Sequence, residues 1–350
     1  MRKMEMIFIK PTLSEIAKEL GIAVSTVSRA LNKKEGISED LRKKVLDKAL
    51  KMGYIDEIPK IIQQSQNIIG VIIPNIQNPF FLTFLKGIET ILFRMNHRFI
   101  VCNTDEDVVK ERVYLKWLSE SKVKGVIAAP AFSISGETNI NLYKKINQYI
   151  PVVLYDREFY ETQEFDSVIV DNQAAIVDGV RHLHEKGHKR IGILLSKRGN
   201  YCIEERHKGF MKALRYFNLK TENKWILENL YPSSSAEEKL NSFFELDNRP
   251  TAMIATNHDI SYSFLRIAKK YNIKVPDDIS LLGFSEVPEN EIVNPPLTVI
   301  KQPILEIGNI AATAMLTRIE NRNKEVSQIV LKTTIVERKS IKNITKKGRG

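Results

Sequence analysis

The chain has 350 residues, of which 43% are hydrophobic and 27% charged, and this composition is typical of a globular protein with two or three domains. It contains no apolar run of the roughly 20 residues that a membrane-spanning helix needs, and its N-terminus lacks the apolar stretch of a signal peptide. Its two cysteines, Cys102 and Cys202, are too few for a disulfide framework or a zinc finger. We therefore expect a soluble cytoplasmic protein.

The net charge of +11 is concentrated at the two ends of the chain. Residues 1–60 hold 13 Lys and Arg against 9 Asp and Glu, and residues 332–350 hold 7 against 1. Basic ends indicate a polyanionic partner such as nucleic acid, or an anionic membrane. For the last residues, 341–350, a disordered and solubilising basic tail is the simpler interpretation. Charge alone therefore allows nucleic-acid binding without proving it.

Residues 12–53 have the pattern of three short helices. Thr12 and Glu15 have the spacing of a capping box at the start of the first helix. A tight turn that contains glycine leads to a second helix over 24–31, and Ser38 can cap a third. Three helices in about 40 residues, the first two joined by such a turn, predict a helix-turn-helix.

A polar segment that contains Pro59 follows and predicts a linker over 55–67. Beyond it, segments with helical periodicity alternate with short apolar runs that are typical of buried parallel strands. The runs lie at 68–73, 99–102, 126–129 and 152–155, and then at 167–170, 191–195, 252–255 and 279–283. Two successive sets of βαβ units predict two doubly wound lobes with a cleft at their strand ends.

Several motifs in this order resemble one protein family. TVSRALN follows the helix-turn, and NPFF and ISLLGF follow downstream. Over about residues 12–338 the chain resembles the lactose-repressor (LacI/GalR) family of bacterial transcription regulators. Members carry a helix-turn-helix head, a hinge, and a core similar to periplasmic sugar-binding proteins. They work as dimers on near-palindromic operators, and small ligands modulate their DNA affinity.

The resemblance implies an N-terminal all-α helix-turn-helix head and a bilobal, periplasmic-binding-protein-like α/β core with two doubly wound parallel sheets. It implies dimerisation through the helix at 79–95 and its neighbours, and the tail has no apolar heptad for a coiled coil. The expected boundaries are 1–54 for the head, 55–67 for the hinge, 68–340 for the core and 341–350 for the tail. Within the core we expect lobe 1 over 68–157 and 296–322, and lobe 2 over 166–288 and 326–340.

On the family pattern, the start of the second helix enters the major groove, where base edges carry a full donor and acceptor code. Arg29 can bind guanine O6 and N7 with two hydrogen bonds, worth roughly 1–3 kcal/mol of discrimination; the alternative is an ordinary solvated helix residue. Ala23 departs from the family, which usually has a capping Ser there, at a cost of about 1 kcal/mol in helix stability. The implied DNA contacts are Thr12, Val24, Ser25, Thr26, Ser28, Arg29 and Asn32, of which Thr26, Ser28 and Asn32 suit phosphates.

The hinge departs further from the family. Members usually carry a short helix whose Leu wedges into the minor groove at the operator centre. Here the segment is about two residues short and contains Pro59. Ile61 or Ile62 can still act as the wedge, because any apolar side chain can unstack a base step; a merely flexible hinge is the alternative.

The resemblance also implies a set of effector contacts around the cleft. Sugar-responsive members commonly have Asn-Asp where this chain has Asn257 and His258, and a carboxylate where it has Ser285. These losses favour a more acidic ligand, such as a phosphorylated or carboxylated sugar. The alternatives are core packing for Phe81 and a surface position for Arg206. The complete set is Asn75, Phe80, Phe81, Asp156, Arg157, Arg206, Asn257, His258, Ser285 and Gln302.

Two other classes of protein compete with this interpretation. His184 and His188 fit the H-E-x-x-H pattern of zinc proteases, but Gly187 predicts that the helix ends between them. A solute-binding protein would share the core fold, but not the helices of 12–53. No phosphate-binding loop or nucleophile elbow is present. We expect a homodimeric repressor of carbohydrate uptake or catabolism genes that binds operator DNA and a sugar-like effector, without enzymatic activity, cofactor, metal or membrane partner.

Overall fold

The computed structural model describes residues 11–32, 36–54, 67–133, 136–230 and 234–345. The chain divides into two compact units, residues 1–66 and residues 67–350. The predicted hinge, with Ile61 and Ile62, lies outside the described residues. None of the described helices is both long and apolar enough to cross a membrane.

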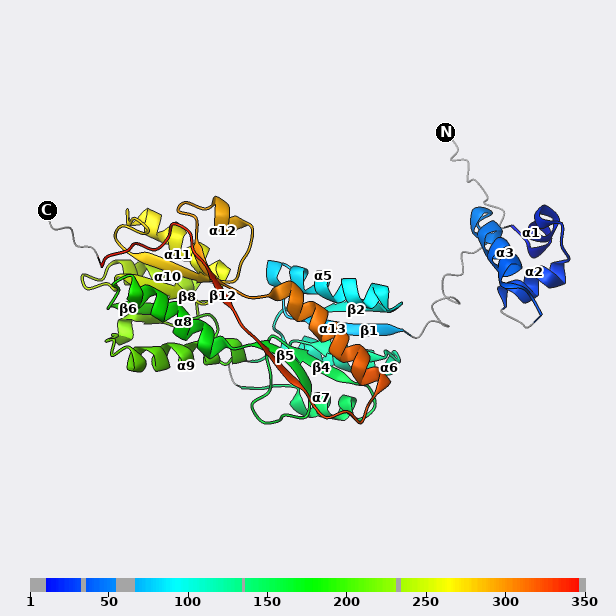
Figure 1. The fold of residues 1–350 in the computed structure, drawn as a ribbon, viewed down its shortest axis with the longest axis horizontal. Helices are drawn as coiled ribbons and strands as arrows, with labels where there is room; N and C mark the ends of the chain where they lie inside the picture. The colour runs from blue at the N-terminus through cyan, green and yellow to red at the C-terminus, as the bar shows by residue number, and fades with distance from the viewer. Residues whose placement is uncertain (1–10, 33–35, 55–66, 134–135, 231–233, 346–350) are drawn as a thin grey trace, which may run out of the picture. The chain divides into compact units, whose positions relative to one another are not determined.

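The described part of the first unit consists of the helices α1 (Leu13–Leu20), α2 (Val24–Leu31) and α3 (Glu39–Lys51), drawn in blue in Figure 1. The predicted capping box is confirmed: the Thr12 hydroxyl accepts from the Glu15 amide at 3.3 Å, and the Thr12 amide donates to the Glu15 carboxylate at 2.6 Å. Ser38 Oγ accepts from the Leu41 amide at the start of α3. Small and branched side chains from all three helices form the core: Ile16, Ala17, Val27, Ala30, Val45 and Ala49.

The second unit contains two six-stranded sheets among its described residues. In the first sheet every pair of neighbours is parallel, in the order β11-β5-β4-β3-β1-β2. Its strands are β1 (Ile68–Ile73), β2 (Arg98–Asn103), β3 (Gly125–Ala128), β4 (Val152–Tyr155), β5 (Asp166–Val170) and β11 (Gln328–Leu331).

The second sheet has the order β12-β10-β9-β8-β6-β7, in which only the β10–β12 pair is antiparallel. Its strands are β6 (Ile191–Leu194), β7 (Ile226–Leu227), β8 (Ala252–Ala255), β9 (Ser280–Phe284), β10 (Thr298–Lys301) and β12 (Thr334–Val336). Both sheets therefore show the doubly wound order that the sequence predicts, with helices on both faces.

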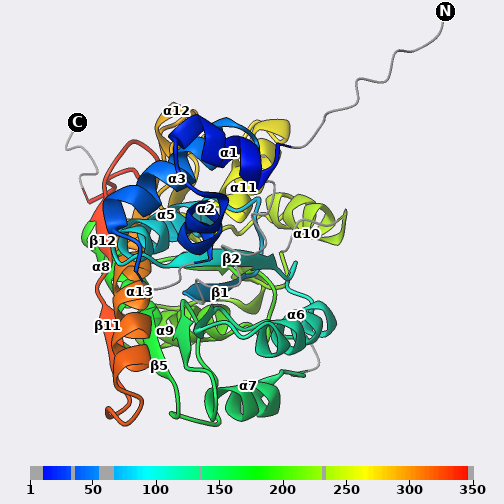
Figure 2. The same cartoon turned by 90° about the vertical axis from the view of Figure 1, so that its right-hand side faces the viewer.

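Helices cover both faces of the first sheet to form the first lobe (Figure 2). Ile69, Val71 and Ile73 pack toward α5 and α13, whereas Ile72 packs toward α6 and α7. This alternation follows from the two-residue period of a strand whose faces are both buried. The helices are α5 (Pro79–Arg94), α6 (Val108–Glu120), α7 (Ile140–Asn147) and α13 (Ile304–Glu320).

The second lobe is built in the same way. Ile254 packs toward α8 and α9, whereas Met253 and Ala255 pack toward α10 and α11. The elements are α8 (Asn172–Glu185), α9 (Tyr201–Tyr216), η1 (Asn223–Trp225), α10 (Ser234–Phe244), α11 (His258–Lys270) and α12 (Glu289–Ile292).

The chain crosses between the lobes at different points from those predicted. β5 pairs with β4 in the first sheet, so the first crossing follows residue 170. β10 pairs with β9 in the second sheet, so the return falls after residue 301. β11 belongs to the first sheet, so the last crossing lies between residues 331 and 334. The predicted lobe boundaries were wrong here because an apolar run shows a buried strand but not the strand with which it pairs.

The predicted tail boundary also needs correction, because residues up to 345 pack against the second lobe. The Ile344 amide donates to the Lys186 carbonyl at 2.8 Å. Ser340 is buried, with its hydroxyl donating to the Leu281 carbonyl at 2.6 Å. The Lys342 carbonyl lies 3.0 Å from a ring nitrogen of His188. The segment is therefore part of the fold, and only residues 346–350 lie outside the described chain.

Candidate functional site

Helix α2 of the first unit presents an exposed face of varied chemistry. Counted from Val24, the positions i, i+1, i+4, i+5 and i+8 fall within about 140° of one another around a helix of 3.6 residues per turn. Val24, Ser25 and Arg29 on this arc are exposed. Val27 and Ala30, on the opposite side, are buried in the three-helix core. The exposed face is thus held by a packed core directly beneath it.

The other predicted DNA contacts lie on the same unit. Thr12 is the capping residue of α1, and Thr26 and Ser28 are half-buried on α2. Asn32 ends α2 and folds its side-chain amide back onto the Ser28 carbonyl at 2.9 Å. Ala23 supplies no side-chain hydrogen bond to the start of α2, as the sequence predicts. That these side chains contact DNA stays a prediction.

A cleft of about 730 Å³ lies in the second unit, lined by residues of both lobes. Its lining comes largely from segments that follow the carboxyl ends of parallel strands, the place where doubly wound folds bind ligands. All ten predicted effector contacts line it: Asn75, Phe80, Phe81, Asp156, Arg157, Arg206, Asn257, His258, Ser285 and Gln302. The structure therefore brings the predicted set together, while ligand binding by these residues stays a prediction.

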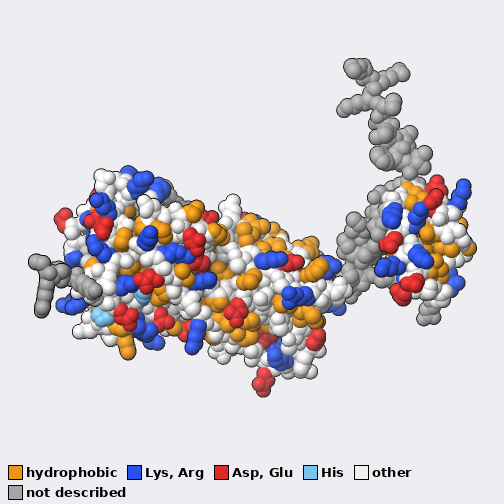
Figure 3. All heavy atoms as spheres, turned by 45° about the horizontal axis from the view of Figure 1, so that its top comes forward, with side chains coloured by type: hydrophobic (Ala, Val, Ile, Leu, Met, Phe, Trp, Pro, Cys, Tyr) orange, Lys and Arg blue, Asp and Glu red, His pale blue; other side chains and the backbone are white. Residues whose placement is uncertain are grey.

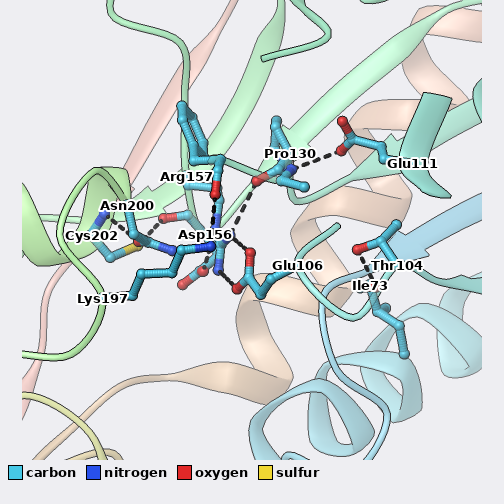
Figure 4. Close-up of polar contacts among 12 residues, drawn as sticks. Ile73, Thr104, Glu106, Glu111, Pro130, Asp156, Arg157, Lys197, Asn200 and Cys202 are labelled. Atoms are coloured by element: carbon cyan, nitrogen blue, oxygen red, sulfur yellow. Dashed lines mark hydrogen bonds and ion pairs between the residues drawn. The ribbon is translucent and has the colours of Figure 1, made fainter. Parts of the chain in front are cut away.

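On the first-lobe side of the cleft, Arg157 is enclosed by acceptors (Figure 4). Its Nη1 and Nη2 atoms donate to the two carboxylate oxygens of Glu106 at 2.8 and 3.0 Å, and Nη1 also donates to the Pro130 carbonyl. Its Nε atom lies 3.4 Å from Asp156. Burial lowers the pKa of this guanidinium, but the two carboxylates outweigh burial and raise the pKa above its ordinary value. Arg157 therefore has a fully compensated charge.

Behind this arginine, α6 carries a buried carboxyl group. Glu111 accepts hydrogen bonds from the Ala131 amide at 2.8 Å, from Asn139 Nδ2 at 2.7 Å and from the Tyr143 hydroxyl at 2.8 Å. Burial raises the pKa of Glu111 to about 7 in spite of these three donors. The carboxyl group therefore titrates near neutral pH, close to the cleft-lining chain that follows β3.

On the second-lobe side, Arg206 has a different environment. It lies on α9, buried, and its Nε and Nη1 atoms donate to Asn172 Oδ1 at 2.8 Å and to the Thr256 carbonyl at 2.6 Å. Its guanidinium carbon lies 3.6 Å from the centre of the Phe284 ring. Among the described residues, no carboxylate lies within 4.0 Å of it as an ion-pair partner. Burial accordingly lowers the pKa of Arg206.

Three further predicted contacts surround this side of the cleft. Ser285 follows β9 with a left-handed backbone (φ 79°), and its hydroxyl donates to Gln302 Oε1 at 2.9 Å. Gln302 is buried, and its Nε2 atom has no hydrogen-bond partner among the described residues. Asn257 caps α11 by accepting from the Ile260 amide. Ser285 and Gln302 together leave an amide donor available to a ligand.

Direct hydrogen bonds join the two sides of the cleft. The Cys202 thiol on α9 donates to the Asp156 carbonyl of the first lobe at 3.1 Å, and burial raises the pKa of this thiol to about 12. The Tyr160 hydroxyl, from the segment after β4, donates to Glu205 on α9 at 2.8 Å. These contacts fix the start of α9, which carries Arg206, against the first lobe.

Some cleft residues were not predicted from the sequence. Glu106 compensates Arg157, Phe132 adds an aromatic side chain, and Lys197 extends its Nζ atom to 3.4 Å from the Phe132 carbonyl in the other lobe. Each stands three or four positions after a strand of the two sheets. These residues could therefore have been predicted by including the few positions that follow each predicted strand end.

The histidine pair of the H-E-x-x-H pattern does not form a helical metal site. Helix α8 ends at Glu185, between His184 and His188, and Gly187 adopts φ 92°. The His188 ring lies between the Thr251 hydroxyl at 2.9 Å and the Lys342 carbonyl at 3.0 Å, and burial lowers its pKa. No group of three or more potential metal ligands occurs in the described part of the chain. His188 therefore anchors the C-terminal segment.

Known proteins share this combination of head and core. Residues 12–57 match the family described as bacterial regulatory proteins, lacI family, and residues 180–341 match a periplasmic binding protein-like domain. The "HTH-type transcriptional repressor PurR" of Photobacterium profundum is 28% identical over 340 residues, which cover 95% of this chain and 99% of that protein.

Solved structures agree in fold. A LacI family transcriptional regulator from Enterococcus faecium with bound ribose is 27% identical and has a TM-score of 0.66, covering 79% of this chain and all of that one. The Lac repressor dimer bound to operator and the anti-inducer ONPF has a TM-score of 0.77 at 20% identity, covering 95% of this chain and all of that one, and it supports the fold alone. With the helix-turn-helix, the doubly wound lobes and both family matches in agreement, the chain combines a lacI-family helix-turn-helix head with a periplasmic binding protein-like core, the domain organisation of LacI-family transcription regulators.

Proposed function

We propose that this chain is a dimeric repressor that binds a near-palindromic operator, and that its operator affinity changes when a sugar-like ligand occupies the cleft. The observation that carries the proposal is the exposed face of α2 on a packed helix-turn-helix, in a chain that also holds a cleft at its strand ends. The relative from Photobacterium profundum is named a repressor, which supports the direction of regulation.

The exposed face of α2 has the chemistry needed to read DNA. Arg29 can bind guanine in the major groove through two hydrogen bonds, and Val24 can contact a thymine methyl group. Ser28 and Asn32 lie on the same arc and suit phosphate oxygens, which fix the position of the protein without reading the sequence. The face therefore combines both kinds of contact that a sequence-specific regulator requires.

The cleft has the lining of a small-molecule site. Phe80 and Phe81 offer aromatic surface, and Asn75, Asn257 and Gln302 offer amide groups. A sugar presents an apolar ring face and several hydroxyl groups, which this combination suits. The relative with bound ribose supports the same ligand class, and we assign the regulated genes to carbohydrate uptake or catabolism on this basis. The ligand acts by binding more tightly to one arrangement of the lobes than to another.

Exposed apolar side chains support a homodimer through the first lobe. β2 is the edge strand of its sheet, and α5 and α6 lie on either side of it (Figure 2). Hydrophobic side chains gather on the surface of this lobe (Figure 3). The exposed large hydrophobic residues of this lobe include Leu82 and Phe93 of α5, Met95 just after it, and Val109, Val113 and Trp117 of α6. Several exposed apolar side chains on one lobe are typical of an association surface; sedimentation velocity on the full chain, with Phe93→Glu as the disrupting variant, tests the assignment.

Selection from a random duplex library tests the proposed DNA recognition. We expect the purified chain to enrich a near-palindrome and to bind it at least a thousandfold more tightly than random DNA, as specific regulators do. Fluorescence anisotropy at two salt concentrations then separates the phosphate contacts, which depend steeply on salt, from base contacts.

Two variants of the head sharpen this test. Arg29→Ala should relax the preference at one base position of each half-site, because it removes a base contact. Lys44→Ala removes the same charge from an exposed position of α3, so it should change affinity for operator and random DNA alike. Equal binding to all sequences, unaffected by ligand, would overturn the proposal.

A further inference from the structure

The two sides of the cleft carry opposite charge. Among the described residues, the first-lobe side contributes the carboxylates of Asp105, Glu106, Asp107, Glu137 and Asp156 and one cationic side chain, Arg157. The described part of the second-lobe side contributes the cations of Lys197 and Arg206 and one carboxylate, Asp259. A ligand that spans the cleft therefore meets hydrogen-bond acceptors on one side and cationic donors on the other.

Two carboxylates of the second lobe close to the cleft have partners other than Arg206. Glu286, next to Ser285, binds Arg338 at 2.9 and 3.1 Å and does not line the cleft. Asp259 lies 3.2 Å from His258 Nε2. Arg206 thus keeps its charge among neutral acceptors, the Asn172 side chain and the Thr256 carbonyl, and over an aromatic ring.

Such an arrangement costs free energy unless an anion completes it. A buried charge is stable when it is paired, and Arg157 across the cleft shows this pairing with Glu106. Arg206 has no comparable partner, and the Nε2 donor of Gln302 is also buried and unsatisfied among the described residues. Two buried donors that line one cleft and lack an anionic acceptor form a built site for such a group.

We propose that the effector carries an anionic group, a carboxylate or a phosphate, which Arg206 binds on the second-lobe side together with Lys197 and the Gln302 amide. The hydroxyl groups of the same ligand then face the carboxylates of the first-lobe side. The inference rests on the proposed function in one respect, namely that the cleft is the effector site. It narrows the ligand class to acidic sugars, either sugar acids or sugar phosphates.

Inorganic phosphate is the first probe, because it presents the anionic group alone. With the full chain, thermal unfolding and calorimetric titration are run at constant ionic strength, with chloride as the balancing anion. We expect phosphate to raise the unfolding temperature of the core, and Arg206→Gln to weaken phosphate binding at least tenfold. Lys197→Gln is the second variant: its side chain is half-buried with one long hydrogen bond, so it removes charge from the site without disturbing a core contact.

The matched control is Arg181→Gln, on α8. Arg181 is half-exposed, pairs with Asp178 one turn away and lies outside the cleft, so the change in net charge is the same. Phosphate binding should be unchanged in this variant. If phosphate fails to bind, or binds Arg206→Gln and Lys197→Gln as well as the parent chain, the inference is wrong.

A second arm separates the two sources of the anionic group. Neutral hexoses and pentoses are compared with their phosphates and with the corresponding sugar acids, by titration and by their effect on affinity for the selected operator. A response to the sugar phosphates alone identifies the anionic group as a phosphate, and a response to the sugar acids alone identifies it as a carboxylate. Response to neutral sugars only would overturn this inference and leave the proposed function intact, whereas failure to select any operator would overturn the proposed function by itself.

Discussion

Two buried arginines stand on opposite sides of one cleft, and they differ in what surrounds them. Arg157 and Arg206 are 4% and 6% exposed, so burial does not distinguish them. Arg157 binds Glu106 through two hydrogen bonds and lies beside Asp156, whereas Arg206 donates to an amide and a backbone carbonyl. The comparison teaches that compensation, rather than burial, separates an arginine that holds the fold from one that is available to a ligand.

The largest expected effect is on the compensated arginine. Arg157→Met leaves the carboxylates of Glu106 and Asp156 without their cation, and removal of one partner from a buried pair costs about 3–5 kcal/mol. Arg206→Met removes a charge whose hydrogen-bond partners among the described residues are neutral, so the free energy of unfolding should fall by only about 1–2 kcal/mol. Urea unfolding followed by tryptophan fluorescence measures both, because Trp117 lies in the first lobe and Trp225 in the second.

Similar losses of unfolding free energy in Arg157→Met and Arg206→Met would contradict this distinction between the two arginines, because it requires the larger loss in Arg157→Met. Arg181→Met serves as the reference for loss of an exposed arginine, for which the free energy of unfolding should change by less than about 1 kcal/mol.

The second prediction concerns pH and the first-lobe side alone. Burial raises the pKa of Glu111 to about 7 in the folded state, against about 4.5 when the chain is unfolded. The folded state therefore holds the proton more tightly, so the stabilisation is fully present below pH 4.5 and is lost as the pH rises through 7. Between pH 5 and pH 8 the free energy of unfolding should fall by about 2–3 kcal/mol relative to Glu111→Gln.

Glu111→Gln keeps the shape of the side chain and removes its titration. Unfolding curves of both proteins across this pH range check the sign as well as the size. A parent chain that gains stability toward pH 8 relative to the variant would show that the three donors around Glu111 outweigh its burial.

The third prediction concerns a variant that adds a carboxylate to the second-lobe side of the cleft, as on the first-lobe side. Ser285→Asp places a carboxylate next to Gln302, whose Nε2 atom has no partner among the described residues, and near the cleft lining that includes Arg206. Asp tolerates the left-handed backbone of this position better than most residues. We expect inorganic phosphate to bind at least tenfold more weakly, and titration calorimetry measures the change. Ser285→Asn, which has the same shape without the charge, is the control, and equal weakening in both variants would exclude a charge effect.

The positions of the cleft-lining residues could largely be predicted from the sequence, because its apolar runs show where the strands end. The apolar runs at 68–73, 152–155 and 252–255 match β1, β4 and β8 residue for residue. In parallel sheets the carboxyl ends of the strands meet at one edge, so polar residues that follow each run converge on the cleft. The family resemblance then selected Arg157 and Arg206 among them.

The sequence could not show how these charges are compensated. Glu106 follows β2 and reaches Arg157, 51 positions further along the chain, only once both segments are packed. The pairing of β5, β10 and β11 with one sheet or the other is set by backbone hydrogen bonds between distant segments, which an apolar pattern does not encode. The C-terminal segment near Lys342 has the composition of a basic tail, yet the Lys342 carbonyl contacts the ring of the buried His188.

The smallest expected effect lies where the two sides of the cleft meet. The Tyr160 hydroxyl donates to Glu205 across the lobes at 2.8 Å, and the Tyr160 ring lies 5.0 Å from that of Tyr201 on α9. Tyr160→Phe keeps the ring contact and removes one partly exposed hydrogen bond, worth about 0.5–1 kcal/mol. Because this bond stabilises the arrangement in which Arg206 faces the first lobe, we expect phosphate affinity to fall by about two- to fivefold.

Tyr216→Phe is the matched control for this change. Tyr216 lies at the other end of α9, is largely exposed and packs against Phe217 of its own lobe, so its hydroxyl does not bridge the cleft in the structure. Titration calorimetry with inorganic phosphate should give the parent affinity for Tyr216→Phe and a weaker one for Tyr160→Phe. An unchanged or tighter affinity in Tyr160→Phe would mean that the anionic site forms on the second lobe without the first. The opposite charges of the two sides would then act on the ligand independently rather than through closure of the lobes.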